Sequence, residues 1–225
     1  GPGRICVYSG KTGALLASPI GSSRGDRTGV EAAGIGDFDN DGTNDYLAGA
    51  GRHDGAGKDA GRVIIYSGRT HKPLTHLDGE RAGDQFGLAA EGVFDGKTAL
   101  LVVGAPKAGP RKTGRAYVYR GRDLKLAFTL EGDASGAAFG EMFVSIPGDI
   151  DGDSVSDIYV TDWRNRAKGA NTGRAYVYSG KDGSRLATFS GRSGEGFGIG
   201  KAAAGDVDGD GAADLIIGAW QNSDG

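Results

Sequence analysis

Three stretches of the sequence concentrate aspartate at one repeated spacing that is typical of a metal-binding loop. They cover residues 37–45, 149–157 and 206–214, and each has aspartate at its first, third, fifth and ninth positions. Four carboxylates in one tight turn repel one another unless a cation neutralises them. Hard oxygen donors on a flexible loop suit Ca²⁺, which takes six to eight oxygen ligands.

The seventh residue of each loop is expected to add a backbone carbonyl to these carboxylates. The predicted calcium ligands are therefore Asp37, Asp39, Asp41, Thr43, Asp45, Asp149, Asp151, Asp153, Val155, Asp157, Asp206, Asp208, Asp210, Ala212 and Asp214. The loops are not EF-hands, because their twelfth positions hold Ala48, Val160 and Ile217 where an EF-hand needs a bidentate glutamate.

A fourth stretch, residues 92–99, occupies the equivalent place but is shorter, keeps only Asp95 and carries Lys97. We expect no metal there, and hence three Ca²⁺ sites in all. An ordinary Asp/Gly turn is the alternative for each loop, but three copies in register favour the metal. Since one unit does without the ion, Ca²⁺ is expected to lock loops and not to define the fold.

The elements that position these loops form a tandem repeat. Each unit begins with a Gly-Arg phrase rich in β-branched and aromatic residues, and the units cover 3–60, 61–113, 114–172 and 173–225. Gly1-Pro2 looks like the remnant of an expression tag and is left outside the repeat. The recurring arginines, Arg4, Arg62, Arg115 and Arg174, are expected to make either ion pairs between units or hydrogen bonds to loop carbonyls.

Each unit is predicted to contain four short strands and almost no helix, because glycines and Asp/Gly turns interrupt every apolar run. Glycine makes up 44 of the 225 residues, which suits many tight turns. Besides the Gly-Arg phrases, the expected strands are 14–20, 74–77, 127–130, 186–189, 30–35, 46–50, 100–105, 158–161, 201–204 and 215–219. Four strands in each tandem unit fit an all-β fold, a β-propeller of four-stranded antiparallel blades.

The chain is expected to open on the third strand of a blade and to end after the second. Residues 3–27 would supply the third and fourth strands, and residues 194–225 the first and second. Joining these ends would form a terminal blade from both ends of the chain and close a four-bladed ring. The alternatives are a part of a larger ring, or half of an eight-bladed dimer.

Composition excludes several classes of protein. The single thiol, Cys6, permits neither an internal disulfide nor a cysteine-based zinc site. A formal net charge of −3 gives no reason to expect nucleic-acid binding. No apolar run approaches the ~18 residues of a membrane span, so membrane insertion is not expected.

Two further motifs accompany the aspartate loops and carry a family resemblance. Phe-Gly occurs at 86–87, 139–140 and 197–198, and Gly-Ala-Pro or a variant at 49–51, 104–106 and 218–220. In this combination the sequence resembles the FG-GAP repeat family, the β-propeller repeats of integrin α-subunit heads and of many bacterial secreted proteins. Thr28-Gly29 and Thr161-Asp162-Trp163 depart from the two motifs. The resemblance implies Ca²⁺ in the aspartate loops of one face and partner binding by loops of the opposite face.

The loops between the second and third strands differ from unit to unit, and variable loops on a rigid scaffold commonly bind partners. Trp163 beside two arginines has the composition of an interaction hot spot. The candidate partner-binding residues are Trp163, Arg164, Arg166, Lys107, Arg111 and Lys112. An acidic protein or a glycan is the expected partner, and a solvated basic rim is the alternative.

The sequence indicates no catalytic constellation. It has no Gly-x-Ser-x-Gly elbow. The Arg24-Gly25-Asp26 tripeptide is a known cell-adhesion signal, but residues 25–29 align with an ordinary loop, residues 83–87, which favours a structural role. We therefore expect a calcium-stabilised, non-catalytic recognition or adhesion module that is extracellular or periplasmic. The alternatives are a scaffold domain of a larger secreted hydrolase and a self-associating half-propeller, a homodimer.

Overall fold

The computed structural model describes residues 1–200 and 203–221 and shows an all-β protein, as predicted. These residues form sixteen strands and no helix. This described part therefore offers no helix that is long and apolar enough to cross a membrane. Of the expected strands, the start of 201–204 lies outside the described residues.

The strands group into three complete blades flanked by two hairpins. The N-terminal hairpin is β1 (Val7–Tyr8) and β2 (Leu15–Ala17). The first blade is β3 (Glu31–Gly36), β4 (Asp45–Ala50), β5 (Arg62–Tyr66) and β6 (Pro73–Asp78). The second blade is β7 (Ala90–Phe94), β8 (Ala99–Ala105), β9 (Arg115–Arg120) and β10 (Lys125–Glu131). The third blade is β11 (Val144–Gly148), β12 (Asp157–Asp162), β13 (Arg174–Tyr178) and β14 (Arg185–Ser190). The C-terminal hairpin is β15 (Ala203–Gly205) and β16 (Asp214–Leu215).

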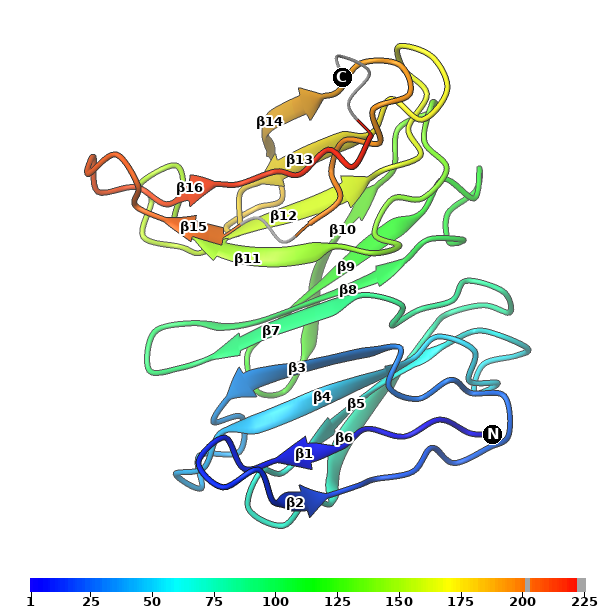
Figure 1. The fold of residues 1–225 in the computed structure, drawn as a ribbon, viewed down its shortest axis with the longest axis vertical. Coiled ribbons are helices and arrows are strands. Elements are labelled where there is room, and N and C mark those ends of the chain that lie inside the picture. Colours follow the sequence, from blue (N-terminus) through cyan, green and yellow to red (C-terminus); the bar gives the residue numbers. More distant parts are fainter. Residues whose placement is uncertain (201–202, 222–225) are drawn as a thin grey trace.

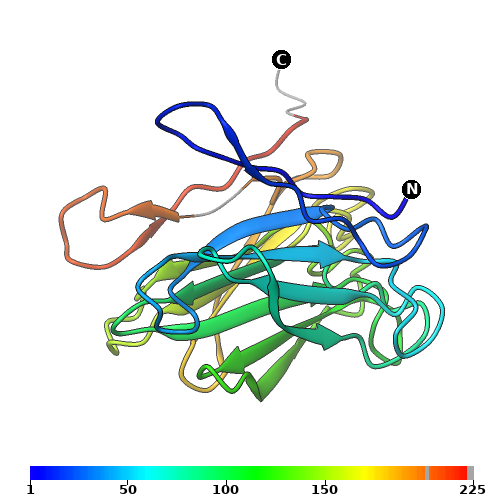
Figure 2. The same ribbon diagram turned by 90° about the horizontal axis from the view of Figure 1, so that it is seen from below.

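Within each blade, consecutive strands pair antiparallel, and the blades are arranged along an arc (Figure 1). The first and second blades count as one eight-stranded sheet, because a single parallel bridge joins Gly36 of β3 to Phe94 of β7. Figure 2 gives the same arc from below, with both terminal hairpins on one side of the complete blades. These features are those of a β-propeller segment.

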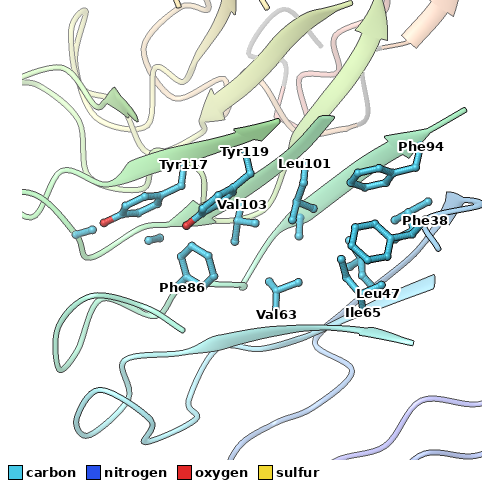
Figure 3. Packing of buried hydrophobic residues seen from close by; sticks show 14 residues of the cluster. Phe38, Leu47, Val63, Ile65, Phe86, Phe94, Leu101, Val103, Tyr117 and Tyr119 are labelled. Atoms are coloured by element: carbon cyan, nitrogen blue, oxygen red, sulfur yellow. The ribbon is translucent and has the colours of Figure 1, made fainter. Parts of the chain in front are cut away.

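The hydrophobic core lies between the blades. Successive side chains of a strand point to opposite faces, so every blade can pack on both of its neighbours. Leu47 and Ile65 of the first blade meet Phe94 and Leu101 of the second (Figure 3). Val102 and its neighbours on the other face of the second blade pack against the third. Burial between consecutive blades therefore holds the arc together.

The Phe-Gly and Gly-Ala-Pro motifs meet where two blades approach closely. The N–H of Gly87 donates to the carbonyl of Gly104 at 2.9 Å within the second blade. A Cβ added to Gly49 would overlap the carbonyl oxygen of Gly87 in the next blade, and one on Gly104 would overlap that of Gly140. Glycine is therefore required in this motif by the spacing of the blades. Among the three complete blades, only the third has another residue at the first position of this motif, Thr161.

The recurring arginines connect consecutive blades, as predicted, in two of the units. Arg115 Nη1 lies 3.7 Å from Glu80 Oε2, and Arg174 Nη1 lies 2.8 Å from Asp133 Oδ2. Both acids follow the last strand of the preceding blade. Burial alone would raise the pKa of Asp133, but hydrogen bonds from Tyr176 and Arg174 outweigh it and lower the pKa. These contacts fix the third strand of one blade to the end of the one before.

The two terminal hairpins form separate two-stranded sheets and do not share a blade in this structure. They lie toward opposite ends of the longest axis (Figure 1). The terminal blade built from both chain ends therefore stays a prediction. Pro2 takes part in the fold, because its carbonyl accepts the N–H of Thr28 at 3.0 Å, as Ala60 accepts that of Phe86.

Candidate metal loops and the opposite loop face

The three aspartate loops are the turns between the first and second strands of their units, β3–β4, β11–β12 and β15–β16. Together with the β7–β8 turn they follow one edge of the arc (Figure 1). The loops between second and third strands follow the other edge. The sequence assignment of the two sets of loops to opposite faces thus agrees with the structure.

Aspartate side chains shape the first loop by accepting backbone hydrogen bonds. Asp37 accepts the N–H groups of Asp41 at 3.0 Å and Gly42 at 2.9 Å. Asp45, which is buried, accepts the N–H of Phe38 and that of Gly68 in the β5–β6 turn, both at 2.8 Å. Charge-assisted bonds of this kind are strong, so the first and ninth positions hold the loop and tie it to its own blade.

The same hydrogen bonds recur in the other two loops. Asp149 and Asp206 accept N–H groups from the fourth, fifth and sixth positions of their loops. Asp157 accepts the N–H of Gly180 at 3.0 Å, which matches the bond between Gly68 and Asp45. Burial raises the pKa of Asp157, and the hydrogen bonds from Gly180 and Ile150 oppose it. The aspartate spacing in the sequence therefore encodes one loop conformation three times.

Carboxylate oxygens converge in each loop. Three carboxylates offer oxygens within 4.8 Å of one another in each loop, and the sets are Asp37, Asp39 and Asp41; Asp149, Asp151 and Asp157; and Asp206, Asp208 and Asp210. Loss of hydration and the neighbouring charges of Asp45 and Asp41 raise the pKa of Asp39. Such donors fit a hard divalent cation. Ligation by the carbonyls of Thr43, Val155 and Ala212 stays a prediction.

Basic side chains lie beside the loops, an arrangement that the aspartate spacing does not predict. Arg69 Nε lies 3.1 Å from Asp41 Oδ2, and Lys181 Nζ lies 3.5 Å from Asp153 Oδ2. Each base directly follows a turn glycine, Gly68 or Gly180, whose N–H donates a hydrogen bond to the aspartate at the ninth loop position. In the second blade the equivalent base, Arg122, reaches into the first blade and donates to the carbonyl of Asp37 at 2.9 Å.

The fourth loop has different chemistry. The carboxylate of Asp95 accepts the N–H groups of Lys97 at 2.7 Å and Thr98 at 2.6 Å. These bonds lower the pKa of Asp95. A backbone–backbone hydrogen bond, from the N–H of Asp95 to the carbonyl of Thr98, closes a tight turn. That this turn takes no metal stays a prediction.

A groove of about 420 Å³ lies on the opposite edge, where loops of all three blades meet. It is lined by Arg27, Val30, Glu31, Arg52, Gln85, Leu88, Glu141, Met142, Trp163 and Arg164. Trp163 is held in place, since its N–H donates to Glu141 Oε2 at 3.0 Å and the Arg164 guanidinium stacks 4.4 Å from its ring centre. The groove combines cations with exposed apolar side chains.

The structure separates the six predicted partner-binding residues. Trp163 and Arg164 line the groove, whereas Lys107 and Lys112 line another hollow, of about 320 Å³, beside Glu80 and Asp84. Arg111 and Arg166 are exposed and line neither. The predicted set is therefore not one site.

Groove residues from other loops were not among the predicted partner-binding residues. Arg27 and Val30 precede the first blade, Arg52 follows β4, and Glu141 and Met142 follow the Phe-Gly motif of the third blade. Their common position beside Phe-Gly or Gly-Ala-Pro was a usable signal. Only the arc, however, brings these loops together.

The Arg24-Gly25-Asp26 tripeptide does not present its carboxylate to solvent. Asp26 is buried and accepts hydrogen bonds from the N–H of Ser23 at 2.9 Å and the hydroxyl of Ser22 at 3.0 Å. His53 Nδ1 lies 3.1 Å away. Asp26 therefore supports its own loop, as its alignment with Asp84 suggested.

In the third blade the corresponding loop is supported by the carboxylate of a strand residue, Asp162. Ala137 stands where Asp26 and Asp84 stand in the other units, and Asp162 of β12 accepts the N–H groups of Ala137 at 3.1 Å and Ala138 at 3.0 Å. Burial raises the pKa of Asp162 to about 6, against these bonds. The departure from Gly-Ala-Pro at Thr161-Asp162-Trp163 thus has a structural cause.

Comparison with known proteins agrees with this architecture. A family model described as an FG-GAP-like repeat matches residues 149–217, which include strands β12 to β14 of the third blade and the last aspartate loop. The chain is 34% identical to integrin alpha-4 of Xenopus laevis over 84% of its own length. The chain belongs to the FG-GAP repeat family.

Two other relatives of this FG-GAP chain are also integrin α-subunits. The chain is 32% identical to integrin alpha-E of Homo sapiens over 77% of its length, and 28% identical to integrin alpha-V of Gallus gallus over 95%. The alignments cover only 19%, 16% and 22% of integrins alpha-4, alpha-E and alpha-V. The sequence similarity is therefore limited to a part of each integrin α-subunit.

Proposed function

We propose that this FG-GAP chain is a calcium-stabilised recognition module that binds its partner on the edge opposite the aspartate loops. The observation that carries the proposal is the pairing of two built features on opposite edges. One is a set of three loops in which the first and ninth aspartates accept loop N–H groups and the carboxylates converge. The other is a groove assembled by three blades around an ordered tryptophan.

The calcium part rests on the donor set. Carboxylate oxygens in a glycine-containing turn suit Ca²⁺ better than softer metals. Titration calorimetry with Ca²⁺ should give three sites per chain, and Asp208→Asn should remove one without unfolding the protein. A count of three that Asp208→Asn leaves unchanged, or no heat at millimolar Ca²⁺, contradicts this part.

The recognition part rests on the groove. Arg27, Arg52 and Arg164 outnumber Glu31 and Glu141 there, and Val30 and Met142 expose apolar surface. An acidic protein segment or an anionic glycan with an apolar portion fits this lining. Names of integrin relatives support an adhesive role at the cell exterior, and the same loops suit millimolar extracellular Ca²⁺.

Arrays of acidic peptides and anionic glycans, probed with the whole chain in Ca²⁺, test this proposal. Trp163→Ala should weaken capture at least roughly ten-fold, because it removes an aromatic anchor. Lys112→Ala, in the other hollow, is the matched control and should leave it unchanged. Equal losses from the two variants would argue against the groove.

Self-association is a second candidate role, and a different observation favours it. Both terminal hairpins expose large apolar side chains, among them Tyr8, Leu15, Val207 and Ile216. Patches of this kind on opposite ends of an arc suit a homodimer.

A further inference from the structure

A hollow of about 630 Å³ lies between the second and third blades, on the edge that carries the aspartate loops. Its walls come from the β7–β8 turn and the end of β9 on one side, and from the β11–β12 loop and the β13–β14 turn on the other. This volume is typical of a pocket for a small molecule, which is roughly 300 to 1,000 Å³. Among the described residues, the hollow shares no lining residue with the recognition groove.

The hollow is present because the first turn of the second blade is short. Residues 95–98 connect β7 to β8, whereas residues 37–44 connect β3 to β4 in the first blade. At the boundary of the first and second blades, Arg122 donates to the carbonyl of Asp37 at 2.9 Å and to Asn40 Oδ1 at 2.7 Å in that longer loop. The equivalent base at the next boundary, Lys181, faces the short turn and lines the hollow.

The lining of the hollow is positively charged. Within the described part of the chain, three cations and one carboxylate line it, and they are Lys97, Arg120, Lys181 and Asp149. The Asp149 carboxylate already accepts three N–H groups of its own loop, at 2.8 to 3.1 Å. Lys181 Nζ lies 3.5 Å from Asp153 Oδ2, and this lysine side chain is 65% exposed. An exposed ion pair of that length is weak, so Lys181 can turn to a bound anion.

Arg120 is held in position at the wall of the hollow. Its Nη2 donates to the carbonyls of Gly180 and Lys181, and its guanidinium lies 5.5 Å from the ring centre of Phe128. A guanidinium carries five N–H donors on three nitrogens, and these two bonds use one nitrogen. A fixed donor loses little conformational entropy when it binds a ligand. Arg120 therefore presents an ordered cation to the hollow.

Three hydroxyl groups add neutral donors to these cations. Thr98 Oγ1 lies 3.3 Å from Ser156 Oγ, across the boundary of the two blades. Ser154 lines the hollow from the sixth position of its loop, where the other two aspartate loops have Gly42 and Gly211. Its φ of 68° lies in the left-handed region that favours glycine. The serine therefore does not serve the backbone, and it places a hydroxyl where the other loops have no side chain.

We propose that this hollow binds a sulfate or phosphate group, carried as an ester on a small polar molecule such as a sugar. The oxygens of such a group accept several charge-assisted hydrogen bonds at once, which Lys97, Arg120 and Lys181 can donate. The hollow is larger than the anion alone, and Leu100 and Val155 provide apolar wall for the carbon atoms of a sugar ring. The chain thus has an anion site on the aspartate-loop edge, separate from the recognition groove.

Titration calorimetry of the whole chain in millimolar Ca²⁺ tests this inference. Glucose 6-sulfate and glucose 6-phosphate are the probes, and at least one of them should bind, whereas glucose should not. Inorganic sulfate distinguishes the two sources of the anion: binding as tight as that of the ester identifies the free anion as the ligand, and weaker binding shows that the sugar contributes. The inference is overturned if neither ester binds, or if glucose binds as well as the esters do.

Two variants with a matched control locate the site. Lys181→Ala should weaken binding of the ester at least roughly ten-fold, because it removes a charge-assisted donor. Ser154→Gly should weaken it by about three-fold through loss of a neutral donor, with the fold intact because glycine stands at this position in the other two loops. Arg69→Ala is the control, since Arg69 makes the corresponding ion pair in the first blade but does not line the hollow. Equal losses from Lys181→Ala and Arg69→Ala would reveal unspecific attraction by charge and overturn the inference.

The anion site and the recognition groove can fail separately. Trp163→Ala should leave the titration with the esters unchanged, because Trp163 lines the groove on the other edge. A chain that binds neither ester would leave the recognition proposal standing. Loss of Trp163-dependent capture would, in turn, leave the anion site standing.

Discussion

The β3–β4 loop of the first blade and the β7–β8 turn of the second blade have the same position in their blades but opposite chemistry. The former gathers four aspartates, and the latter keeps Asp95 alone. In the first blade the turn glycine Gly68 donates its N–H to a side chain, that of Asp45. In the second, Gly121 donates to the backbone carbonyl of Ala99 at 3.0 Å.

This difference shows that the blade framework does not need the aspartate loop. The strands of both blades pair in corresponding registers, with Tyr46 opposite Tyr66 and Leu101 opposite Tyr119. Backbone bonds and burial between blades form the framework, and the carboxylates fold only the loop. The second blade even stabilises the loop of the first, through Arg122.

The largest effect on the free energy of unfolding is expected at Asp45. Asp45→Ala leaves the N–H groups of Phe38, Asp39 and Gly68 without their acceptor. We expect a loss of about 3 to 5 kcal/mol in the free energy of unfolding, measured in urea with chelator present. Asp95→Ala is the matched control and should cost much less, since its turn is exposed. Equal losses would show that the two loops are energetically alike.

Exchanging the loops should remove one calcium site and keep the fold. In this variant residues 37–45 are replaced by Asp-Gly-Lys-Thr-Ala-Leu, the sequence of residues 95–100 in the second blade. Each remaining site should still stabilise the protein by about 2.7 kcal/mol when Ca²⁺ is at 100 times its dissociation constant. Calorimetry should count two sites; three sites in a folded variant would contradict the assignment of the loop.

A pH experiment extends the comparison to the other edge, where Asp162 of the third blade replaces a loop aspartate. Its pKa is raised to about 6 by burial, above its ordinary value of 3.8. The folded state therefore holds the proton more tightly, and the stability from this group is complete below pH 4 and lost as the pH rises through 6. The loss amounts to about 2 to 3 kcal/mol. Asp162→Asn should flatten this part of the stability profile between pH 4 and 7, and an unchanged slope would exclude Asp162 as its source.

The smallest effect is expected at the bases around the first loop. Arg122→Ala removes bonds to Asp37 and Asn40 and should cost about 0.5 to 1 kcal/mol without Ca²⁺. It should also tighten Ca²⁺ binding in this loop slightly, because a competing positive charge is lost. Arg69→Ala, which removes a base of the same blade, should act in the same direction. Weaker Ca²⁺ binding in both variants would mean that the bases help to order the site.

Most of the strand framework could be predicted from the sequence. The strands expected at 46–50, 100–105 and 158–161 were found within one residue at each end. They are bounded by Asp/Gly turns and glycines, which act locally. The Ala14–Ile20 strand was too long, since β2 covers only Leu15–Ala17. Its partner strand β1 covers only Val7–Tyr8, so the ladder that could extend β2 is short.

The candidate sites could be predicted only in part. The aspartate loops follow from spacing, because each carboxylate serves N–H groups a few residues away. The six partner-binding residues were grouped by loop type, and the structure divides them between two hollows and exposed surface. Arg122 and Glu141 act on residues far away in the sequence, and no local pattern marks them.

By itself, the sequence determined the repeat, the strand order within each blade and the conformation of the aspartate loops, since these depend on short-range turn chemistry and on alternation along a strand. Only the tertiary structure decided that Asp26 is buried, that loops of three blades share one groove, and that Tyr8 and Ile216 remain exposed at the ends of the arc. These properties depend on how each blade is rotated against the next. That rotation results from packing across the whole interface, which no single repeat contains.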